Sequence, residues 1–392
     1  MLFHFGKLKD TMRIIHLILG KANPDRMNGV NKLVFEMVST QQALGFNVRL
    51  WGISKSPVHN YPERNFRTEL FQMTSNKLSI HTDIQKAINA LSPDTVFHLH
   101  GSFIPEFYHI GKLLTNRKIP FVYTPHGALA PAALKRSGWK KKIYFKLFEK
   151  TLLQNAACMI ATGQSVYDNV DTLIQVQRKA LIPNGQSLII RHETSRKAEQ
   201  IIFGFCGRIA LKHKGLDLLL EGFKIFKAKG GDAVIHFIGD GEEMLKFKKI
   251  ARDLGVLDDL TFFGAQFGED KFRLLSSFDV FVHTSRMEGF PAAVLEATAI
   301  GLPVLISKHT NVWDYISKYD CGLLIDPNTP ENIASQLVAF EKLFKSEKLR
   351  EMGENAQRMI TDIFDWKVIC MQLYDEYVSA CKLNAAIENV KK

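Results

Sequence analysis

The chain has 392 residues, of which 51 are lysine or arginine and 40 are aspartate or glutamate, so its formal net charge is +11. Hydrophobic residues make up 46% of the chain and charged residues 23%, which are ordinary proportions that exclude a disordered or fibrous protein. At about 150 residues per domain, the length suggests two or three domains, and two of about 190 residues is the simplest division.

The first half of the chain alternates predicted strands and helices. After a tail of residues 1–11, the apolar segment Arg13–Leu19 predicts a strand, and residues 20–29, with Asn, Pro and two Gly, predict a loop. Apolar residues at helical spacing from Val30 to Leu44 predict a helix that ends at Gly45. We also expect a helix at 78–91 and strands at 48–53, 95–98, 121–124, 158–161 and 180–182.

The second half repeats this alternation after residues 186–200, a polar and charged segment that predicts a linker. We expect strands at 201–206, 233–238, 260–263, 280–283, 303–306 and 322–325. Helices are predicted between them, including 215–229 and 244–254, and a long final helix is predicted at 366–381. Alternating strands and helices are typical of parallel sheets that helices cover on both faces. The predicted class is therefore α/β, with two doubly wound domains whose ligands bind beyond the carboxyl ends of the strands.

The pattern from Glu288 to Glu296 is the strongest functional signal. Glu288 precedes a predicted helix and Glu296 lies inside it, with Gly289 allowing a tight turn between them. A carboxylate accepts hydrogen bonds from adjacent hydroxyls, so each glutamate can hold a sugar or a ribose. The alternatives are a helix-surface carboxylate at Glu296 and a charge that favours the helix N-terminus at Glu288. The following Ala-x-x-Gly-Leu-Pro-Val segment makes a chance match less frequent.

A second signal follows the predicted strand 201–206. Arg208 and Lys214 bring two cations to the end of this strand, beside the amides of the helix that follows Gly215. Cations and helix N-termini together suit a diphosphate. Two solvated surface cations are an equally good interpretation of these residues taken alone.

Two further positions carry weaker signals. Gly29 follows Asn28 at the start of a predicted helix, where it can approach a phosphate or serve only as part of a turn. His126 follows a predicted strand and can donate a hydrogen bond or act as a base, although a single histidine is usually structural. The turn at residues 239–242 lacks the full G-x-G-x-x-G pattern, so no dinucleotide fingerprint is predicted.

Together these motifs resemble the retaining GT-B glycosyltransferases of family 4, the "glycosyl transferases group 1" type. The resemblance extends from about Met12 to about Tyr377 and is most specific between Gly204 and Val304. It implies Rossmann-like domains at 1–185 and 201–365 that face each other across a cleft. It also implies that residues 366–392 form a helix returning to the N-terminal domain. The segments at 124–129 and 139–142 resemble members that assemble bacterial polysaccharides.

The resemblance assigns roles to individual residues. Glu288, with the amides of Gly289 and Phe290, would hold hydroxyls of the donor sugar, and Glu296 would hold the ribose. Arg208 and Lys214 resemble the phosphate clamp, His126 resembles the histidine beside the sugar, and Gly29 resembles the glycine loop near the diphosphate and acceptor. Two departures stand out, since Asn28 replaces a frequent second glycine and Lys212 competes with Lys214 for the clamp. The predicted catalytic residues are thus His126, Glu288, Arg208 and Lys214, and the predicted donor-binding residues are Gly29, Arg208, Lys214, Gly289, Phe290 and Glu296.

The expected reaction moves a sugar from a UDP- or GDP-linked donor to a glycan or lipid-linked acceptor, with retention of configuration. Cations and helix N-termini would stabilise the negative charge of the leaving diphosphate. Because the chain has no D-x-D motif, no metal is expected, and no cofactor other than the donor. A GT-B nucleotide-sugar epimerase, a phosphorylase and a non-enzymatic sugar-binding protein are alternatives. The basic pI of about 9.3 also admits nucleic acid, but no motif supports that partner.

The cellular location follows from what the sequence lacks. No run of about 18 apolar residues predicts a transmembrane helix, and the apolar run at 14–19 is too short for a signal peptide. The five cysteines are widely spaced without a C-x-x-C, which favours a reducing compartment and the cytoplasm. The segment 140–150 places lysines at positions 142, 146 and 150 among apolar and aromatic residues. It predicts either peripheral contact with the inner face of an anionic membrane or a helix packed on the sheet.

Overall fold

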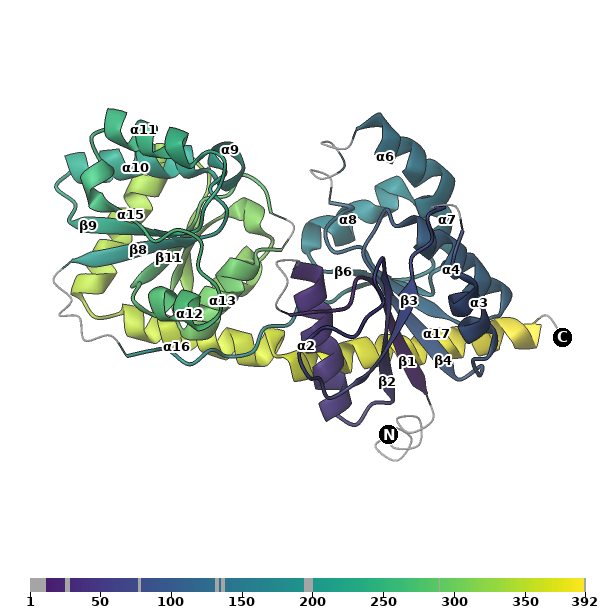
Figure 1. The fold of residues 1–392 in the computed structure, drawn as a ribbon. Coiled ribbons are helices and arrows are strands. Elements are labelled where there is room, and N and C mark those ends of the chain that lie inside the picture. The colour runs from purple at the N-terminus through teal and green to yellow at the C-terminus, as the bar shows by residue number, and fades with distance from the viewer. Residues whose placement is uncertain are drawn as a thin grey trace. The chain divides into compact units, whose positions relative to one another are not determined.

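The computed structural model describes residues 12–24, 29–76, 79–130, 134, 138–193, 200–288 and 290–390, with side chains described as far as residue 383. It divides into two compact units (Figure 1). The N-terminal unit comprises residues 1–185 and 366–392, and the C-terminal unit comprises residues 186–365. The expected tail at 1–11, as well as Asn28 and Gly289, lies outside the described residues.

The N-terminal unit is built on a sheet of seven parallel strands in the order β3-β2-β1-β4-β5-β6-β7. The short runs of apolar residues between polar loops form its central strands, as expected for a sheet buried on both faces. The strands are β1 (Arg13–Leu19), β2 (Val48–Ser54), β3 (Arg67–Gln72), β4 (Thr95–His100), β5 (Phe121–Thr124), β6 (Cys158–Ala161) and β7 (Lys179–Leu181).

Helices cover both faces of this sheet (Figure 1). On one face, α3, α4, α7 and α8 pack against alternate strand residues such as Ile15 and Leu17. On the other face, α2 and α17 pack against Ile14 and Ile18. The helices are α2 (Gly29–Ala43), α3 (Thr82–Asn89), α4 (Pro105–Asn116), α6 (Trp139–Tyr144), α7 (Lys150–Asn155), α8 (Gln164–Leu173) and α17 (Trp366–Val390), with a π-helical turn at Phe145–Glu149.

The C-terminal unit repeats the design with six parallel strands in the order β10-β9-β8-β11-β12-β13. They are β8 (Ile201–Cys206), β9 (Ala233–Ile238), β10 (Leu260–Phe262), β11 (Val280–His283), β12 (Val304–Ser307) and β13 (Gly322–Ile325). Two buried cores lie on opposite faces of the sheet. The helices are α9 (Leu211–Lys214), α10 (Leu216–Ala228), α11 (Met244–Asp253), α12 (Gly268–Ser276), α13 (Ala292–Ile300), α14 (Trp313–Lys318), α15 (Pro330–Lys345) and α16 (Leu349–Met359), with a π-helical turn at Ile360–Phe364 and 3-10 turns at Leu257–Asp259 and Lys308–Thr310.

The predicted α/β class with two doubly wound sheets is confirmed. Two details differ from the sequence prediction. The edge strand β3 was not predicted, because its polar sequence has no run of apolar residues. The described part of the predicted linker, residues 186–193, packs on the C-terminal unit, where Ile189 donates its backbone N–H to Ala299 and Arg191 donates to the carbonyl oxygens of Ser276 and Phe278.

Within the described residues, no helix is both long and apolar enough to span a bilayer.

Candidate active site

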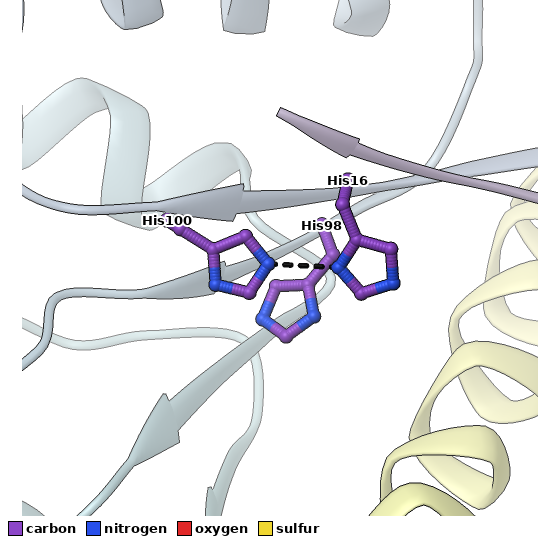
Figure 2. A group of neighbouring side chains, drawn as sticks. All are labelled: His16, His98 and His100. Carbon is purple, nitrogen blue, oxygen red and sulfur yellow. Dashed lines mark hydrogen bonds between the residues drawn. The ribbon is translucent and has the colours of Figure 1, made fainter. Parts of the chain in front are cut away.

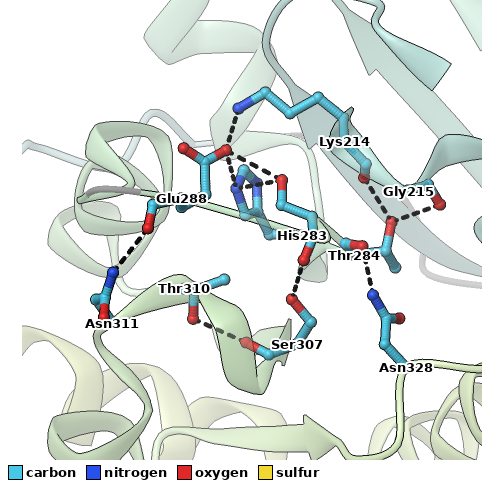
Figure 3. A network of polar contacts seen from close by, with 10 residues as sticks. Lys214, Gly215, His283, Thr284, Glu288, Ser307, Thr310, Asn311 and Asn328 are labelled. Carbon is cyan, nitrogen blue, oxygen red and sulfur yellow. Dashed lines mark hydrogen bonds and ion pairs between the residues drawn. The ribbon is translucent and has the colours of Figure 1, made fainter. Parts of the chain in front are cut away.

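A compact ion-paired cluster lies at the carboxyl end of β11 in the C-terminal unit (Figure 3). Lys214 Nζ donates to Glu288 Oε1, and the same oxygen lies 3.2 Å from His283 Nε2 and 3.0 Å from Ser285 Oγ. Only 16% of the Lys214 side chain and 13% of the Glu288 side chain are exposed. The cluster therefore joins a cation from the end of α9, the short helix after β8, to a carboxylate from the loop after β11.

Charge balance in this cluster keeps the carboxylate ionised. Burial would raise the pKa of Glu288, but the hydrogen bond from His283 and the charge of Lys214 outweigh it and hold the pKa at about 2. Burial lowers the pKa of His283, so this ring is neutral near pH 7 and donates through Nε2–H. Glu288 is therefore a stable anion at neutral pH whose oxygens can accept hydrogen bonds from hydroxyl groups.

Backbone contacts fix the two loops that carry this cluster. Gly215 has φ +64°, and a Cβ there would lie 2.0 Å from the carbonyl oxygen of Thr284, so only glycine fits. The hydroxyl of Thr284 donates to the carbonyl oxygens of Lys214 and Gly215. Asn311 Nδ2 in turn donates to the carbonyl oxygen of Glu288 at 2.7 Å (Figure 3). Positions of Lys214 and Glu288 are thus set by glycine geometry and by hydrogen bonds to the main chain.

Glu296 lies in α13 and forms a second ion pair. Its Oε1 is 2.8 Å from Lys271 Nζ of α12, and 13% of the Glu296 side chain and 15% of the Lys271 side chain are exposed. Phe290 is half-buried, with its ring 6.0 Å from that of Phe364. Each predicted glutamate therefore has a lysine partner, but the partners come from different elements.

The two other predicted cations do not join the Lys214–Glu288 pair. Lys212 is exposed and pairs with Asp217, 2.6 Å away, which also binds Arg286. The Arg208 side chain is exposed, and no hydrogen bond or ion pair to it is found within the described parts of the chain. Lys214, rather than Lys212, therefore occupies the position beside Glu288.

The predicted residues of the N-terminal unit lie in two separate places. Gly29 is exposed at the start of α2, and a Cβ there would meet nothing within 4 Å, so no close approach requires glycine. His126 follows β5 with φ +47°, an infrequent backbone conformation for a residue with a side chain. Its Nε2 lies 3.1 Å from His100 Nδ1. Burial lowers the pKa of His126 to about 4, so the ring is neutral near pH 7.

Sequence reasoning missed several polar residues that the structure adds to these groups. His283 ends the apolar strand β11. Lys271 lies in α12, the helix before that strand. His16, His98 and His100 are polar residues inside otherwise apolar strands (Figure 2). A polar residue within an apolar strand was the available signal for the histidines, whereas nothing local marks Lys271 as the partner of Glu296.

Comparison with known proteins places the chain in a class. Residues 187–359 match the family model described as glycosyl transferases group 1, and residues 27–188 match the one described as glycosyltransferase family 4. A glycosyltransferase from Rickettsia africae superimposes with a TM-score of 0.74 over 95% of this chain and 99% of that chain, at 16% identity. HepE of Anabaena in complex with UDP gives a TM-score of 0.72 over 94% of this chain and 100% of that chain, at 16% identity.

These matches identify the fold as that of the GT-B glycosyltransferases. The chain belongs to the group 1 glycosyltransferases and is an enzyme of that type.

Curated relatives agree with this assignment. Mannosylfructose-phosphate synthase of Agrobacterium fabrum is 28% identical over 70% of this chain and 68% of its own length. The capsular polysaccharide biosynthesis glycosyltransferase CapM of Staphylococcus aureus is 25% identical over 76% of this chain and 82% of its own length. These comparisons give no support to the epimerase alternative.

Proposed function

We propose that the chain is a retaining glycosyltransferase that moves a sugar from a UDP- or GDP-linked donor to a glycan or lipid-linked acceptor in bacterial surface polysaccharide synthesis. The observation that carries this proposal is the half-buried Lys214–Glu288 pair at the carboxyl end of the strands, with Glu296 in the helix that follows. The names of relatives such as CapM support the acceptor class, and the UDP in the HepE structure supports the donor class.

A change of partner at Lys214 explains how the pair serves the reaction. A diphosphate that binds Lys214 competes with Glu288 for the ammonium group, which frees the carboxylate to accept hydrogen bonds from the donor sugar. As the bond to the sugar breaks, negative charge grows on the diphosphate and positive charge grows on the sugar carbon. Lys214 stabilises the first and Glu288 the second. The exposed Arg208 adds a second cation for the diphosphate, so the proposed reaction uses no metal ion and no other cofactor.

Nucleotide binding tests the donor site. We expect one of UDP, GDP, ADP, dTDP or CMP to stabilise the wild-type protein in a thermal-shift panel, by about 2.7 kcal/mol at 100 times its dissociation constant. Glu296→Ala should lose this shift, because it removes the acceptor proposed for the ribose hydroxyls. Glu354→Ala, which breaks an exposed ion pair with Arg350, is the matched control and should keep it. Failure of every nucleotide to shift the wild type would contradict the proposal.

Stereochemistry tests the retaining mechanism separately. Once the donor is known, proton NMR of the first product shows the configuration at the transferred sugar carbon. A product with the configuration of the donor supports retention, and the opposite configuration refutes it while leaving the transferase assignment intact.

We also propose peripheral attachment to an anionic membrane through the segment 139–150. Trp139, Ile143 and Leu147 are 68%, 47% and 59% exposed, which is unusual for such large apolar side chains at a spacing of four. The lysines at 140, 141, 142, 146 and 150 are all exposed around them. An exposed apolar row bordered by cations suits the surface of an anionic bilayer.

A buried carboxylate holds this segment in place. Glu149 accepts hydrogen bonds from the Tyr123 hydroxyl and, at 3.1 Å, from the Phe103 backbone N–H. The π-helical turn at Phe145–Glu149 turns Glu149 inward while Leu147 stays exposed. The exposed surface of this segment combines all five lysines, including those predicted at 142, 146 and 150, with the apolar row.

Vesicle sedimentation tests the attachment. The protein should bind phosphatidylglycerol-containing vesicles and leave phosphatidylcholine vesicles in the supernatant. Lys142→Glu combined with Lys146→Glu should weaken binding by about 1,000-fold, at about 1 kcal/mol for each lysine removed and a similar repulsion for each glutamate added. The control Lys342→Glu with Lys348→Glu makes the same charge change on exposed residues of the C-terminal unit. Equal binding by both double variants would refute the proposed surface.

A further inference from the structure

The loop between β4 and α4, residues 101–104, lies where the strand order of the N-terminal sheet reverses. Strands β1 to β3 follow one another to one side and β4 to β7 to the other, so β1 and β4 are neighbours. In doubly wound sheets, ligands bind in the crevice at this reversal, beyond the carboxyl ends of the strands. The Lys214–Glu288 pair joins the segments that follow β8 and β11, the strands at the corresponding reversal of the C-terminal unit. The loop 101–104 therefore borders the equivalent crevice of the N-terminal unit.

Phe103 in this loop adopts an infrequent backbone conformation. Its φ of +60° lies in the left-handed region, where a residue with a side chain carries a conformational cost and a bulky one is an outlier. Such a conformation persists only where the surrounding structure fixes it, and it is frequent at functional positions. The Phe103 ring is half-buried and packs on the core that includes Leu99 of β4. The other contacts of Phe103 therefore indicate what controls this loop.

Three residues of the segment 139–150 hold Phe103. Glu149 Oε2 accepts a hydrogen bond from the Phe103 backbone N–H at 3.1 Å, and Glu149 is 1% exposed. The ring of Phe103 lies 5.9 Å from the ring of Tyr144. Lys141 Nζ lies 5.2 Å from the centroid of the Phe103 ring, a distance suited to a cation–π contact. The segment proposed to contact the membrane is therefore also the support of the loop 101–104.

The Glu149 carboxylate reaches the neighbouring strand β5 as well. Its Oε1 accepts a hydrogen bond from the hydroxyl of Tyr123, and Ser102 Oγ lies 3.0 Å from that hydroxyl. Burial raises the pKa of Glu149, whereas the hydrogen bonds from Tyr123 and Phe103 lower it. If Glu149 left this position, both donors would lose their acceptor in a place with little water. Movements of the segment and of the loop therefore share one free-energy cost.

A purely structural anchor is the competing interpretation of these contacts. Apolar packing already attaches the segment to the unit, because Leu152 and Leu153 of α7 lie in the same core as Leu99. A buried carboxylate adds a desolvation cost that an apolar side chain at position 149 would avoid. The left-handed conformation of Phe103 adds a second cost. Both costs have a reason if the contact transmits a conformational change, and they have none if it only anchors the segment.

We propose that Glu149 is a positioning residue that couples contact between the segment 139–150 and an anionic membrane to the conformation of the loop 101–104. This rests on the proposed function, which places the donor in the C-terminal unit and leaves the N-terminal crevice to the acceptor. A membrane favours one conformation only if it binds that conformation better than others. It does so here because the π-helical turn that exposes Leu147 also turns Glu149 inward. A crevice that is ordered at the bilayer surface suits a lipid-linked acceptor.

Hydrogen exchange at the Phe103 amide tests the coupling, with phosphatidylglycerol vesicles as the probe. In the wild type, saturating vesicles should slow this exchange about fivefold, the effect of stabilising one hydrogen bond. Glu149→Leu leaves the exposed row and the lysines in place, so it should bind the vesicles as the wild type does. Its Phe103 amide should exchange about fivefold faster without vesicles and should not respond to them. A vesicle effect that persists in Glu149→Leu would overturn the proposal.

Two further variants separate the coupling from a loss of folding. Glu149→Gln keeps an acceptor for the Phe103 N–H and should keep the vesicle effect. The same loss in Glu149→Gln as in Glu149→Leu would refute the hydrogen-bond basis. Glu376→Leu removes another buried carboxylate of the same unit, which pairs with Arg178, and is the matched control. It should leave the response of Phe103 to vesicles unchanged, and an equal loss in this control would count against a specific role of Glu149.

Vesicle binding separates this inference from the proposed function. A wild-type protein that binds the vesicles without slower exchange at Phe103 refutes the coupling alone, and the membrane attachment stands. A wild-type protein that binds no vesicles refutes the attachment and the coupling together. In both cases the nucleotide thermal-shift panel still tests the transferase assignment.

Discussion

The two units share one architecture, but the polar groups on their sheets are charged in one unit and neutral in the other. In the C-terminal unit, Glu288 and Glu296 are ionised side chains, each paired with a lysine. In the N-terminal unit, β1 and β4 instead hold neutral imidazoles that bond to one another and to neutral amide and hydroxyl groups. A doubly wound sheet thus fixes where polar groups gather, while the loops and strand ends determine whether they carry charge.

This difference has a physical consequence for binding. Paired charges remain available to an anionic ligand, because a diphosphate can replace the carboxylate beside a lysine. Neutral rings in a buried chain cannot bind an anion strongly, but they can orient a single hydrogen bond without the desolvation cost of a charge.

Removing charge should therefore matter most in the C-terminal unit. Glu288→Gln keeps the shape of the side chain but leaves Lys214 without its counter-ion and removes the anion that we propose to contact the sugar. We expect the transfer rate to fall about 100- to 1,000-fold, or about 3–4 kcal/mol. Glu69→Gln changes a carboxylate of the N-terminal unit that pairs with Arg49, and it should change the rate less than about twofold. Similar losses in both variants would show that the comparison between the units is wrong.

Gly215 tests the loop that positions Lys214. Gly215→Ala places a Cβ against the Thr284 carbonyl oxygen, whereas Gly255→Ala has a similar φ of +74° and open space. Both variants carry the cost of a left-handed alanine, about 1–2 kcal/mol. Gly215→Ala should lose about 3 kcal/mol more, measured by urea unfolding. Equal losses would mean that the Thr284 contact does not constrain the loop.

Acid should separate the two units. The folded pKa of His16 and of His126 is lowered from 6.5 to about 4, so the unfolded N-terminal unit binds protons first and loses stability as the pH falls below about 6.5. At pH 5 the loss is about 2 kcal/mol for either ring alone. The lowered pKa of Glu288 adds its stability above about 4.5, which is lost between about 4.5 and 2. Hydrogen exchange, corrected for the intrinsic rate at each pH, should show earlier opening of β1 and β4 than of β8 and β11.

The smallest expected effect concerns the attachment of α17. Arg178 donates two hydrogen bonds to Glu376, at 2.7 and 2.9 Å, and 10% of the Glu376 side chain is exposed. Arg178→Ala should lower the free energy of unfolding by about 1 kcal/mol. Arg350→Ala, at an exposed pair within α16, should lower it by less than about 0.5 kcal/mol. No measurable difference in urea unfolding would assign the attachment of α17 to apolar packing alone.

The elements that the sequence predicted best have one strong local pattern. Ile201–Cys206 matches β8 residue for residue, because an uninterrupted apolar run between polar flanks permits little else. Strand β3 has no such run, because Arg67, Glu69 and Gln72 are polar. Pairing with β2 rather than burial stabilises this edge strand. The π-helical turn at 145–149 was not foreseen either, because it ends at Glu149, whose partners Tyr123 and Phe103 lie far away in the sequence.

For the candidate site, local motifs supplied the glutamates and the Lys214 loop, but not their partners. Lys271 reaches Glu296 from another helix, 25 residues away in the sequence, and no local motif indicates this contact. The buried histidines are a different case, because alternation in β1 and β4 already places His16, His98 and His100 on one face. Their meeting with Gln41 and Tyr377 depends on helix packing that only the structure shows.

The position of α17 has a consequence for synthesis of the protein. This helix follows the C-terminal unit in the sequence, yet it packs on β4 and β5 of the N-terminal sheet. On the ribosome, residues 186–365 are complete before α17 emerges, so the C-terminal unit can finish folding first. Until then Val96 of β4 and Val122 of β5 lack part of their apolar cover, and the nascent N-terminal unit exposes an apolar surface. A chain that terminates at residue 365 would keep that surface exposed permanently.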